Sequence, residues 1–182
     1  MDIIIKKMES DAEIKGKAYV HWKSWQEAYP GMVAQSYLDK LTLEKCESIA
    51  FKWPDHILVA KDGENVVGFV GYGKYRNDEL PDTGEVFSIY VLSPYYGKGV
   101  GEALMRKALE LLDQYPKTAV WVLKKNQRAI RFYQRFGYRF DGKEERILLD
   151  TPVSEIRMVR ERQETQSAYS LSERKSLPWK SK

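Results

Sequence analysis

The chain has 182 residues, of which 43% are hydrophobic, and this is enough for one domain with a sizeable core. Its formal net charge is only +4, and its lysines and arginines are spread along the chain, so its composition does not demand a nucleic-acid partner. No apolar run is long enough to span a membrane, and the first ten residues are too few and too charged for a signal peptide. The single cysteine, Cys46, cannot form an internal disulfide and is expected in the core. These features predict a cytoplasmic protein.

Hydrophobic periodicity in the first half of the chain predicts both strands and helices. Isoleucines near the N-terminus predict a strand, whereas apolar residues recur every three or four positions from Glu9 until Pro30 and Gly31 end the helix. The sequence Asp62-Gly63-Glu64 is typical of a hairpin turn. The expected elements are a strand at 2–7, a helix from 9 to 30, a helical stretch, broken or continuous, at about 36–53, a hairpin with strands at 56–61 and 65–75, and a buried strand at 85–92.

The second half continues with helices and strands in alternation. Asn126 is expected to cap a helix, and Gly137 to end it in a left-handed conformation. The expected elements are a helix of about four turns that ends before Pro116, a strand at 118–123, the helix between 126 and 137, and strands at 143–150 and 154–161. Residues 163–182 are polar and without period, which predicts a flexible tail after a domain at 1–162. The element order is β-α-α-β-β-β-α-β-α-β-β.

Three glycines, at positions 97, 99 and 101, lie between a buried strand and a helix. Glycine at such a junction allows a tight turn or the close approach of a ligand, and a helix N-terminus favours an anion. A Walker phosphate loop is excluded, because Gly99 follows Lys98 where a serine or threonine must bind magnesium. A dinucleotide-binding fingerprint is excluded as well, because Glu102 replaces its third glycine and no acidic residue ends the next strand.

The glycines and a second motif together resemble the GNAT superfamily of acetyl-coenzyme A-dependent N-acetyltransferases. The family loop reads Arg or Gln, two residues, Gly, one residue, Gly or Ala, and it corresponds to residues 96–101, with Tyr96 replacing Arg or Gln. The second motif appears as Asn126, Ala129, Phe132-Tyr133 and Gly137-Tyr138. The resemblance extends from residue 3 to about 160. It implies an α/β fold with a mixed, mostly antiparallel central sheet and helices on both faces.

The resemblance further implies that acetyl-coenzyme A binds with its pyrophosphate at the glycine loop. Backbone N–H groups and the helix dipole hold this group, so we expect Tyr96 to weaken binding without abolishing it, and Lys98 to supply a replacement charge. The residues expected to contact the coenzyme are Ile89, Tyr90, Val91, Tyr96, Gly97, Lys98, Gly99, Val100, Gly101, Asn126, Arg128, Ala129, Phe132 and Tyr133.

Acetyl transfer from a thioester to an amine needs a neutral nitrogen, a donor to the developing oxyanion and a proton for the thiolate. By the resemblance, the pantetheine arm lies between strands 85–92 and 118–123, which splay apart and leave the N–H of Val91 as the donor. Tyr133 occupies the position whose hydroxyl points at the sulfur, which implies a general acid. Glu85 is the expected base, with a chain of waters as the alternative.

The acceptor pocket implied by the resemblance lies between the first helices and the loop before the central strand. Aromatic faces together with carboxylates suit a cationic amine. The residues expected to line this pocket are Trp22, Trp25, Tyr29, Asp78 and Glu79, with Asp82 nearby. His21 and His56 are expected to be structural, and no metal site is predicted.

These features predict an N-acetyltransferase that acts in a ternary complex on a small primary amine or short peptide. One alternative is a peptide or protein acetyltransferase that modifies N-termini or lysines, which needs an open groove. An alternative of another class is a non-catalytic acyl-coenzyme A-binding regulatory module, for which Tyr96 is the only sign and against which Tyr133 and Glu85 argue. Neither nucleic acid nor a membrane is an expected partner, and a homodimer is left open.

Overall fold

The computed structural model describes residues 2–162, so the predicted tail at 163–182 lies outside the described residues. Helices and strands follow one another in the predicted order, with the second helical stretch broken into two helices. The elements are β1 (Ile3–Lys7), α1 (Asp11–Ala28), α2 (Gln35–Lys40), α3 (Leu43–Lys52), β2 (Ile57–Asp62), β3 (Asn65–Lys74), β4 (Thr83–Val91), the short 3-10 helix η1 (Ser93–Tyr95), α4 (Val100–Leu111), β5 (Lys117–Leu123), α5 (Gln127–Arg135), β6 (Arg139–Leu149) and β7 (Thr151–Glu161).

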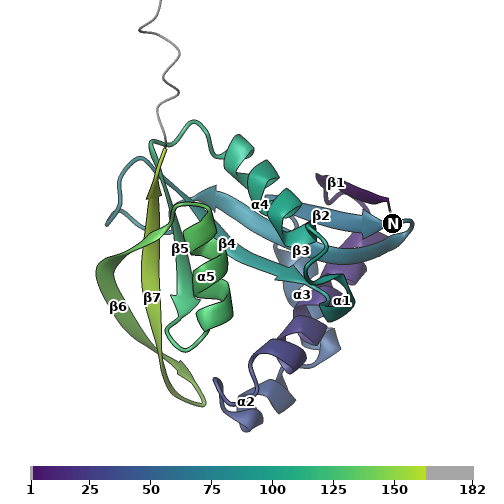
Figure 1. Cartoon of the computed structure of the whole chain (residues 1–182). Helices are drawn as coiled ribbons and strands as arrows, with labels where there is room; N and C mark the ends of the chain where they lie inside the picture. Colours follow the sequence, from purple (N-terminus) through teal and green to yellow (C-terminus); the bar gives the residue numbers. More distant parts are fainter. Residues whose placement is uncertain (1, 163–182) are drawn as a thin grey trace, which may run out of the picture.

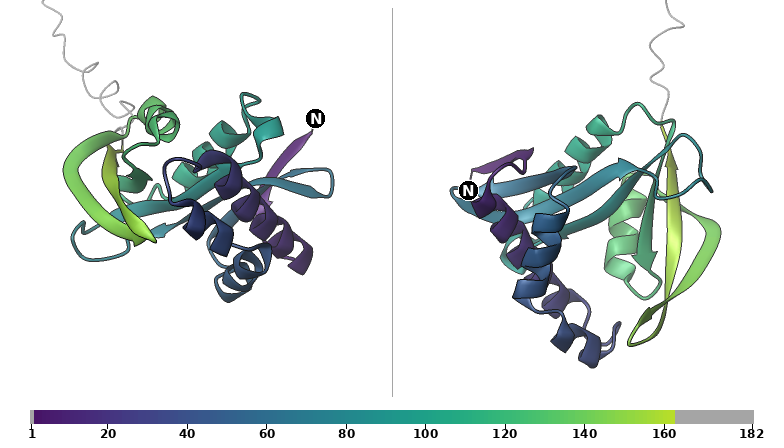
Figure 2. Two further views of the ribbon diagram at one scale, coloured as in Figure 1. Left: turned by 90° about the horizontal axis from the view of Figure 1, so that it is seen from below. Right: turned by 180° about the vertical axis from the view of Figure 1, so that it is seen from behind.

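The strands form one seven-stranded sheet in the order β1-β2-β3-β4-β5-β7-β6. Only β4 and β5 pair in parallel, so the sheet is mixed and mostly antiparallel, as predicted. Helices α4 and α5 cover one face, and α1 and α3 lie on the other (Figure 1). Helix α2 contacts the turn between β6 and β7, where Ser36 and Lys40 bind Asp150. Figure 2 shows the same layers from below and from behind, with the long hairpin of β6 and β7 curving at one end of the sheet.

Side-chain caps explain where several helices begin. The Ser10 hydroxyl accepts a hydrogen bond from the N–H of Glu13 at 3.3 Å, and the Glu13 carboxylate accepts one from the N–H of Ser10, so α1 starts with a capping box. Thr42 caps α3 in a similar way, through the N–H of Lys45. This second cap separates α3 from α2, which is why the helical stretch is broken.

The last hairpin is longer than the sequence analysis expected. Strand β6 begins at Arg139 instead of residue 143, and β7 begins at Thr151 instead of residue 154. Asp150, with φ of 61°, forms the connection alone, and pairing between β6 and β7 continues from Leu149 opposite Thr151 to Arg139 opposite Val159. The predicted bounds of 143–150 and 154–161 are therefore too short.

The core lies mainly between the sheet and helices α4 and α5. Leu104 and Met105 of α4 and Val120 of β5 are fully buried there. On the opposite face, Val20 of α1 packs against Phe69 of β3. Cys46 is buried in a smaller cluster with α1, as predicted. The packing leaves one large opening, where β4 and β5 separate.

Candidate active site

A cavity of about 690 Å³ occupies the region where β4 and β5 separate. The two strands pair from Thr83 with Lys117 to Val86 with Val120, and no further pairs follow toward their C-terminal ends. This is the predicted splay. All residues that were expected to contact the coenzyme line the cavity, with the exception of Lys98.

The separation of the strands exposes a backbone donor. The N–H of Leu92, just after β4, donates to the carbonyl of Val67 at 2.9 Å. Because successive residues of an antiparallel strand direct their N–H groups to opposite sides, the N–H of Val91 points away from β3 and into the gap. Val91 is therefore oriented as the resemblance implied.

The glycine loop leads directly into the N-terminus of α4. Gly97 and Gly99 have φ of 71° and 81°, a left-handed conformation that strains other residues, and Gly99 is the N-cap of α4. A Cβ atom added to either glycine meets no atom within 4 Å. The first N–H groups of α4 have no partners within the helix, so the loop presents open space beside free donors, which suits an anion such as pyrophosphate.

Tyr96, the departure from the family motif, contacts a cation across the cavity. The Arg128 guanidinium of α5 lies 4.2 Å from the centre of the Tyr96 ring and donates to its hydroxyl at 3.1 Å. Lys98 lies over the ring of Tyr95 instead, at 5.5 Å, and does not line the cavity. Of the two cations, Arg128 lines the cavity beside Tyr96 and Lys98 does not.

Tyr133 of α5 lies deep in the cavity, with only 7% of its surface exposed. Burial, followed by the neighbouring hydroxyls of Tyr29 and Tyr138, raises the pKa of Tyr133. Among the described residues, its hydroxyl has no hydrogen-bond partner. A tyrosine with a raised pKa keeps its proton at neutral pH, which is the state that a general acid needs.

Two of the three predicted aromatic residues of α1 and its C-terminus line the cavity. Trp25 donates through Nε1 to the Tyr90 hydroxyl at 2.9 Å, and the Tyr29 hydroxyl lies 3.3 Å from the same oxygen. The prediction for Trp22 is wrong. Three residues before Trp25, its side chain turns toward Leu41 and α3 and lines a separate, smaller hollow.

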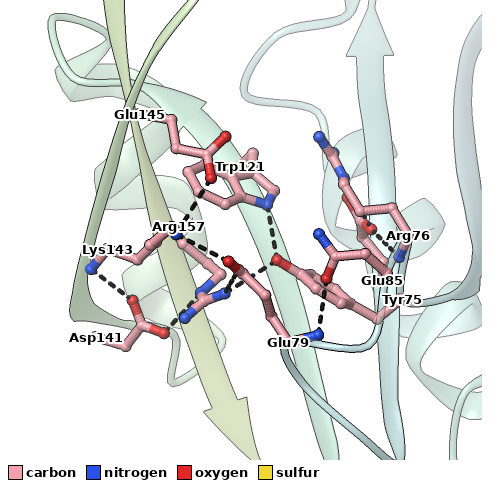
Figure 3. A network of polar contacts seen from close by, with 10 residues as sticks. Tyr75, Arg76, Glu79, Glu85, Trp121, Asp141, Lys143, Glu145 and Arg157 are labelled. Carbon is pink, nitrogen blue, oxygen red and sulfur yellow. Dashed lines mark hydrogen bonds and ion pairs between the residues drawn. The ribbon is translucent and has the colours of Figure 1, made fainter.

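The predicted carboxylates of the loop before β4 do not reach the cavity either. Glu79 forms ion pairs with Lys143 at 2.9 Å and Arg157 at 3.0 Å, in a network that also includes Tyr75 (Figure 3). Asp78 does not line the cavity. Glu79 is thus held against β6 and β7 by Lys143 and Arg157, and the predicted placement of both carboxylates is therefore wrong.

Glu85, the expected base, is fully buried and does not line the cavity. One carboxylate oxygen accepts a hydrogen bond from Nε of Arg76 at 2.9 Å, and the other accepts one from the backbone N–H of Arg76 at 3.1 Å. Figure 3 shows the two side chains directed at each other. Arg76 itself lines the cavity, whereas the Glu85 carboxylate that it binds does not.

The sequence analysis missed several residues that line the cavity. The most informative are Arg76, Phe87, Trp121 and Glu155. Trp121 was expected only as part of a buried strand. The alternation of charged and apolar residues along β7 places Glu155 on a polar face of the strand. Alternation alone does not predict which residues or ligands that face contacts.

Residues 19–138, more than half of the chain, match the Acetyltransferase (GNAT) family. The chain belongs to this family. As a GNAT acetyltransferase it is an acyl-coenzyme A N-acyltransferase, which agrees with the glycine loop and the cavity described above.

Individual relatives support the same assignment. The uncharacterized N-acetyltransferase YuaI of Bacillus subtilis (strain 168) is 33% identical over 132 residues, which cover 69% of this chain and 74% of the relative. The spermine/spermidine N(1)-acetyltransferase of the same strain is 30% identical over 115 residues, or 59% of this chain and 74% of the relative. The crystal structure of the PaiA N-acetyltransferase of Thermoplasma acidophilum in complex with coenzyme A shares the fold, with a TM-score of 0.69 and 18% identity over 89% of this chain and 100% of that one.

Two further observations concern other ligands. Within residues 2–162, no group of histidine, cysteine, aspartate or glutamate side chains is arranged to hold a metal ion. In the same part of the chain, no helix combines the length and the apolar character needed to cross a bilayer.

Proposed function

We propose that this GNAT protein transfers an acetyl group from acetyl-coenzyme A to a primary amine, by direct attack within a ternary complex. The observation that carries the proposal is the single cavity that runs from the glycine loop, through the gap between β4 and β5, to the aromatic residues of α1. Both substrates have access to this gap, so no acyl-enzyme is required. When bound, the coenzyme supplies the acetyl group as an activated thioester.

The chain's own residues fit such a donor. The open space at Gly97 and Gly99 and the free N–H groups of α4 accept the pyrophosphate, with Arg128 as the nearby cation. The N–H of Val91 donates to the thioester oxygen, which gains negative charge during the attack. Tyr133 gives its proton to the departing sulfur, and its burial keeps that proton in place until then.

The acceptor is proposed to be a cationic primary amine. Trp25 and Tyr29 present aromatic faces that attract cations, and Trp121 extends this surface on β5. The relative from Bacillus subtilis that is named as a spermine/spermidine acetyltransferase makes a polyamine a reasonable first test, because its substrates are primary amines with positive charge.

The proposal is tested by measuring coenzyme A release and the acetylated product, with spermidine, 2-phenylethylamine and a dipeptide as acceptors. Gly99→Asp places a negative charge where the pyrophosphate is proposed to lie, and it should weaken acetyl-coenzyme A binding by roughly tenfold or more, as expected for a lost charge-assisted contact. Calorimetry measures this affinity directly.

Gly63→Asp is the matched control. Gly63 also has a positive φ, 58°, and open space around its Cβ position, but it lies in the turn between β2 and β3. Both variants therefore place the same charge on a residue with positive φ and open space around its Cβ position. Equal affinities for wild type and Gly99→Asp would contradict the coenzyme site, and normal binding without any product would favour the non-catalytic regulatory module.

A further inference from the structure

Glu155 is an acidic residue of the cavity wall that the proposed function does not yet use. It lies on β7, opposite Leu123 of β5 and Glu145 of β6. Its side chain is half-buried and lines the cavity. Among residues 2–162, it has no ion-pair or hydrogen-bond partner, although most buried charges in proteins are paired.

Two arginines of this region are already paired with other carboxylates. Arg76, which lines the same cavity, is held by Glu85. Arg157, two residues along β7, is bound by Asp141 at 2.7 Å and by Glu79 at 3.0 Å (Figure 3). This leaves Glu155 as the carboxylate of the acceptor side that still lacks a counter-ion within the described residues.

A second polar group of the cavity also lacks a partner. The hydroxyl of Ser24 on α1 is buried, with 1% of the residue exposed, and it has no hydrogen-bond partner among the described residues. Ser24 lines the same cavity as Glu155. A buried hydroxyl without a partner indicates that a ligand or a water completes its hydrogen bonding.

We propose that Glu155 binds the ammonium group of the acceptor and takes a proton from it, and so acts as the catalytic base in place of Glu85. The inference rests on the proposed function, since it concerns the acceptor half of the same cavity. It is specific to a cationic acceptor, because Glu155 supplies the negative charge and the aromatic residues supply the faces that a cation contacts.

The proton and electron balance is complete with the groups present. Glu155 takes one proton from the ammonium, which frees the nitrogen lone pair. The nitrogen forms a bond to the thioester carbon as the carbon–sulfur bond breaks, and the electron pair of that bond goes to sulfur. Tyr133 protonates the sulfur, and the second proton of the nitrogen returns to Tyr133. The proton on Glu155 then leaves to water.

The surroundings of Glu155 also raise its pKa, which favours its action as a base. Burial raises the pKa of Glu155, Arg76 lowers it, and Glu145 and Glu85 raise it further, with a net increase. A base must be deprotonated to act, so kcat/KM should rise with pH as Glu155 loses its proton. A raised pKa makes the carboxylate a stronger base at neutral pH than a free glutamate is.

The test compares Glu155→Gln with Glu145→Gln. Glu145 faces Glu155 across the β6–β7 pair but does not line the cavity, so it is a matched control for charge and position. With spermidine, 2-phenylethylamine and a dipeptide as probes, Glu155→Gln should lower kcat/KM by roughly 100-fold or more and abolish its rise with pH. Glu145→Gln should keep kcat/KM near the wild-type value and keep a rise with pH, moved toward lower pH because Glu145 no longer raises the pKa of Glu155. Glu155→Asp should restore part of the activity together with the pH dependence.

The outcomes separate the inference from the function on which it rests. If wild type forms product and Glu155→Gln retains activity within a factor of three with the same pH profile, the inference is wrong. A change in KM alone, with kcat and the pH profile intact, would also overturn it, because Glu155 would then bind without taking a proton. If wild type acetylates none of the probes, the proposed function fails and the inference fails with it. Unchanged coenzyme affinity and melting temperature would show that Glu155→Gln is folded.

Discussion

Tyr133 and Tyr138 are two buried tyrosines with neighbouring rings, whose centres lie 5.9 Å apart, yet their hydroxyls have different surroundings. The Tyr138 hydroxyl donates to Thr118 at 2.9 Å, whereas the Tyr133 hydroxyl lies at the cavity without a partner among residues 2–162. At the scale of single residues, this difference separates a structural hydroxyl from one that is free to act on a substrate.

We therefore expect Tyr133→Phe to lower turnover by roughly 100- to 10,000-fold, because the departing sulfur loses its proton donor. Affinity for acetyl-coenzyme A should stay close to that of wild type, since the ring remains in place. Steady-state kinetics with the best acceptor and calorimetry with the coenzyme measure the two effects separately.

Tyr138→Phe provides the comparison. Losing its buried hydrogen bond leaves Thr118 without a partner and should cost about 1 to 3 kcal/mol of stability in urea unfolding, with turnover preserved. If Tyr133→Phe behaved in the same way, with normal turnover and reduced stability, Tyr133 would be a packing residue and the acid would have to be found elsewhere.

At the scale of secondary-structure elements, helix α5 begins at a residue that belongs to the cavity as well. The Asn126 side chain accepts a hydrogen bond from the N–H of Ala129 at 3.1 Å, and Asn126 also lines the cavity. One residue thus has two possible roles, the helix cap and the coenzyme contact. Substitutions that preserve only the cap can separate them.

Asn126→Ala should remove the cap and reduce stability by about 1 kcal/mol in urea unfolding. Asn126→Asp should keep it, because a carboxylate oxygen accepts the same hydrogen bond and favours the positive end of the helix dipole. The added negative charge should nevertheless weaken acetyl-coenzyme A binding. Normal coenzyme affinity in Asn126→Asp would limit Asn126 to the capping role.

Thr42→Ala is the control for the stability measurement. Thr42 caps α3 through the N–H of Lys45 and lies outside the large cavity. This variant should lose a similar amount of stability and bind the coenzyme as wild type does. A loss of affinity in Thr42→Ala would mean that general destabilisation, and not the local charge, weakens binding.

At the scale of the whole molecule, the protonation of His21 makes the stability of the fold depend on pH. It lies on α1 between Trp25, Phe69 and Tyr90, whose ring centres are 5.8 to 6.2 Å away, and its Nδ1 atom is buried without a partner among the described residues. Burial, and then the charge of Lys17, lowers the pKa of His21 to about 4. In the unfolded chain the same group titrates near 6.5.

Between pH 6.5 and 4 the unfolded chain therefore binds a proton at His21 that the folded protein does not bind. Stability must fall as the pH decreases through this window, by about 2 kcal/mol between pH 7 and 5. Urea unfolding at both pH values measures this loss. His21→Phe, which keeps an aromatic ring in the same packing, should reduce the pH dependence.

His56→Asn removes the other histidine and should retain the pH dependence of wild type. Residue 56 lies just before β2 with φ of 58°, a conformation that asparagine tolerates. If wild type and His21→Phe lost the same stability between pH 7 and 5, His21 would not be the cause of the pH dependence.

The sequence by itself determined the order of elements and most of the cavity residues that are proposed to contact the coenzyme. These depend on local signals. Hydrophobic period separates helix from strand, Asn126 caps the helix that it precedes, and Gly137 adopts the expected left-handed conformation, with φ of 87°. The glycine loop and the Asn-Ala-Phe-Tyr motif are short segments, so their spacing is visible in the chain. The sequence did not predict where β6 begins, because the length of β6 depends on its pairing with β7 and not on its own composition.

Only the tertiary structure decided which other side chains line the cavity where the acceptor is proposed to bind. Trp22 and Trp25 share one helix, yet only Trp25 faces the cavity, since α3 packs against Trp22. Glu85 and Glu155 are both glutamates on strands, but Arg76 pairs with the first and leaves the second facing the cavity. The register that places Glu155 opposite Leu123 joins residues 32 positions apart in the sequence. The residues that surround a charged side chain decide its role, and the fold brings those residues together from distant parts of the chain.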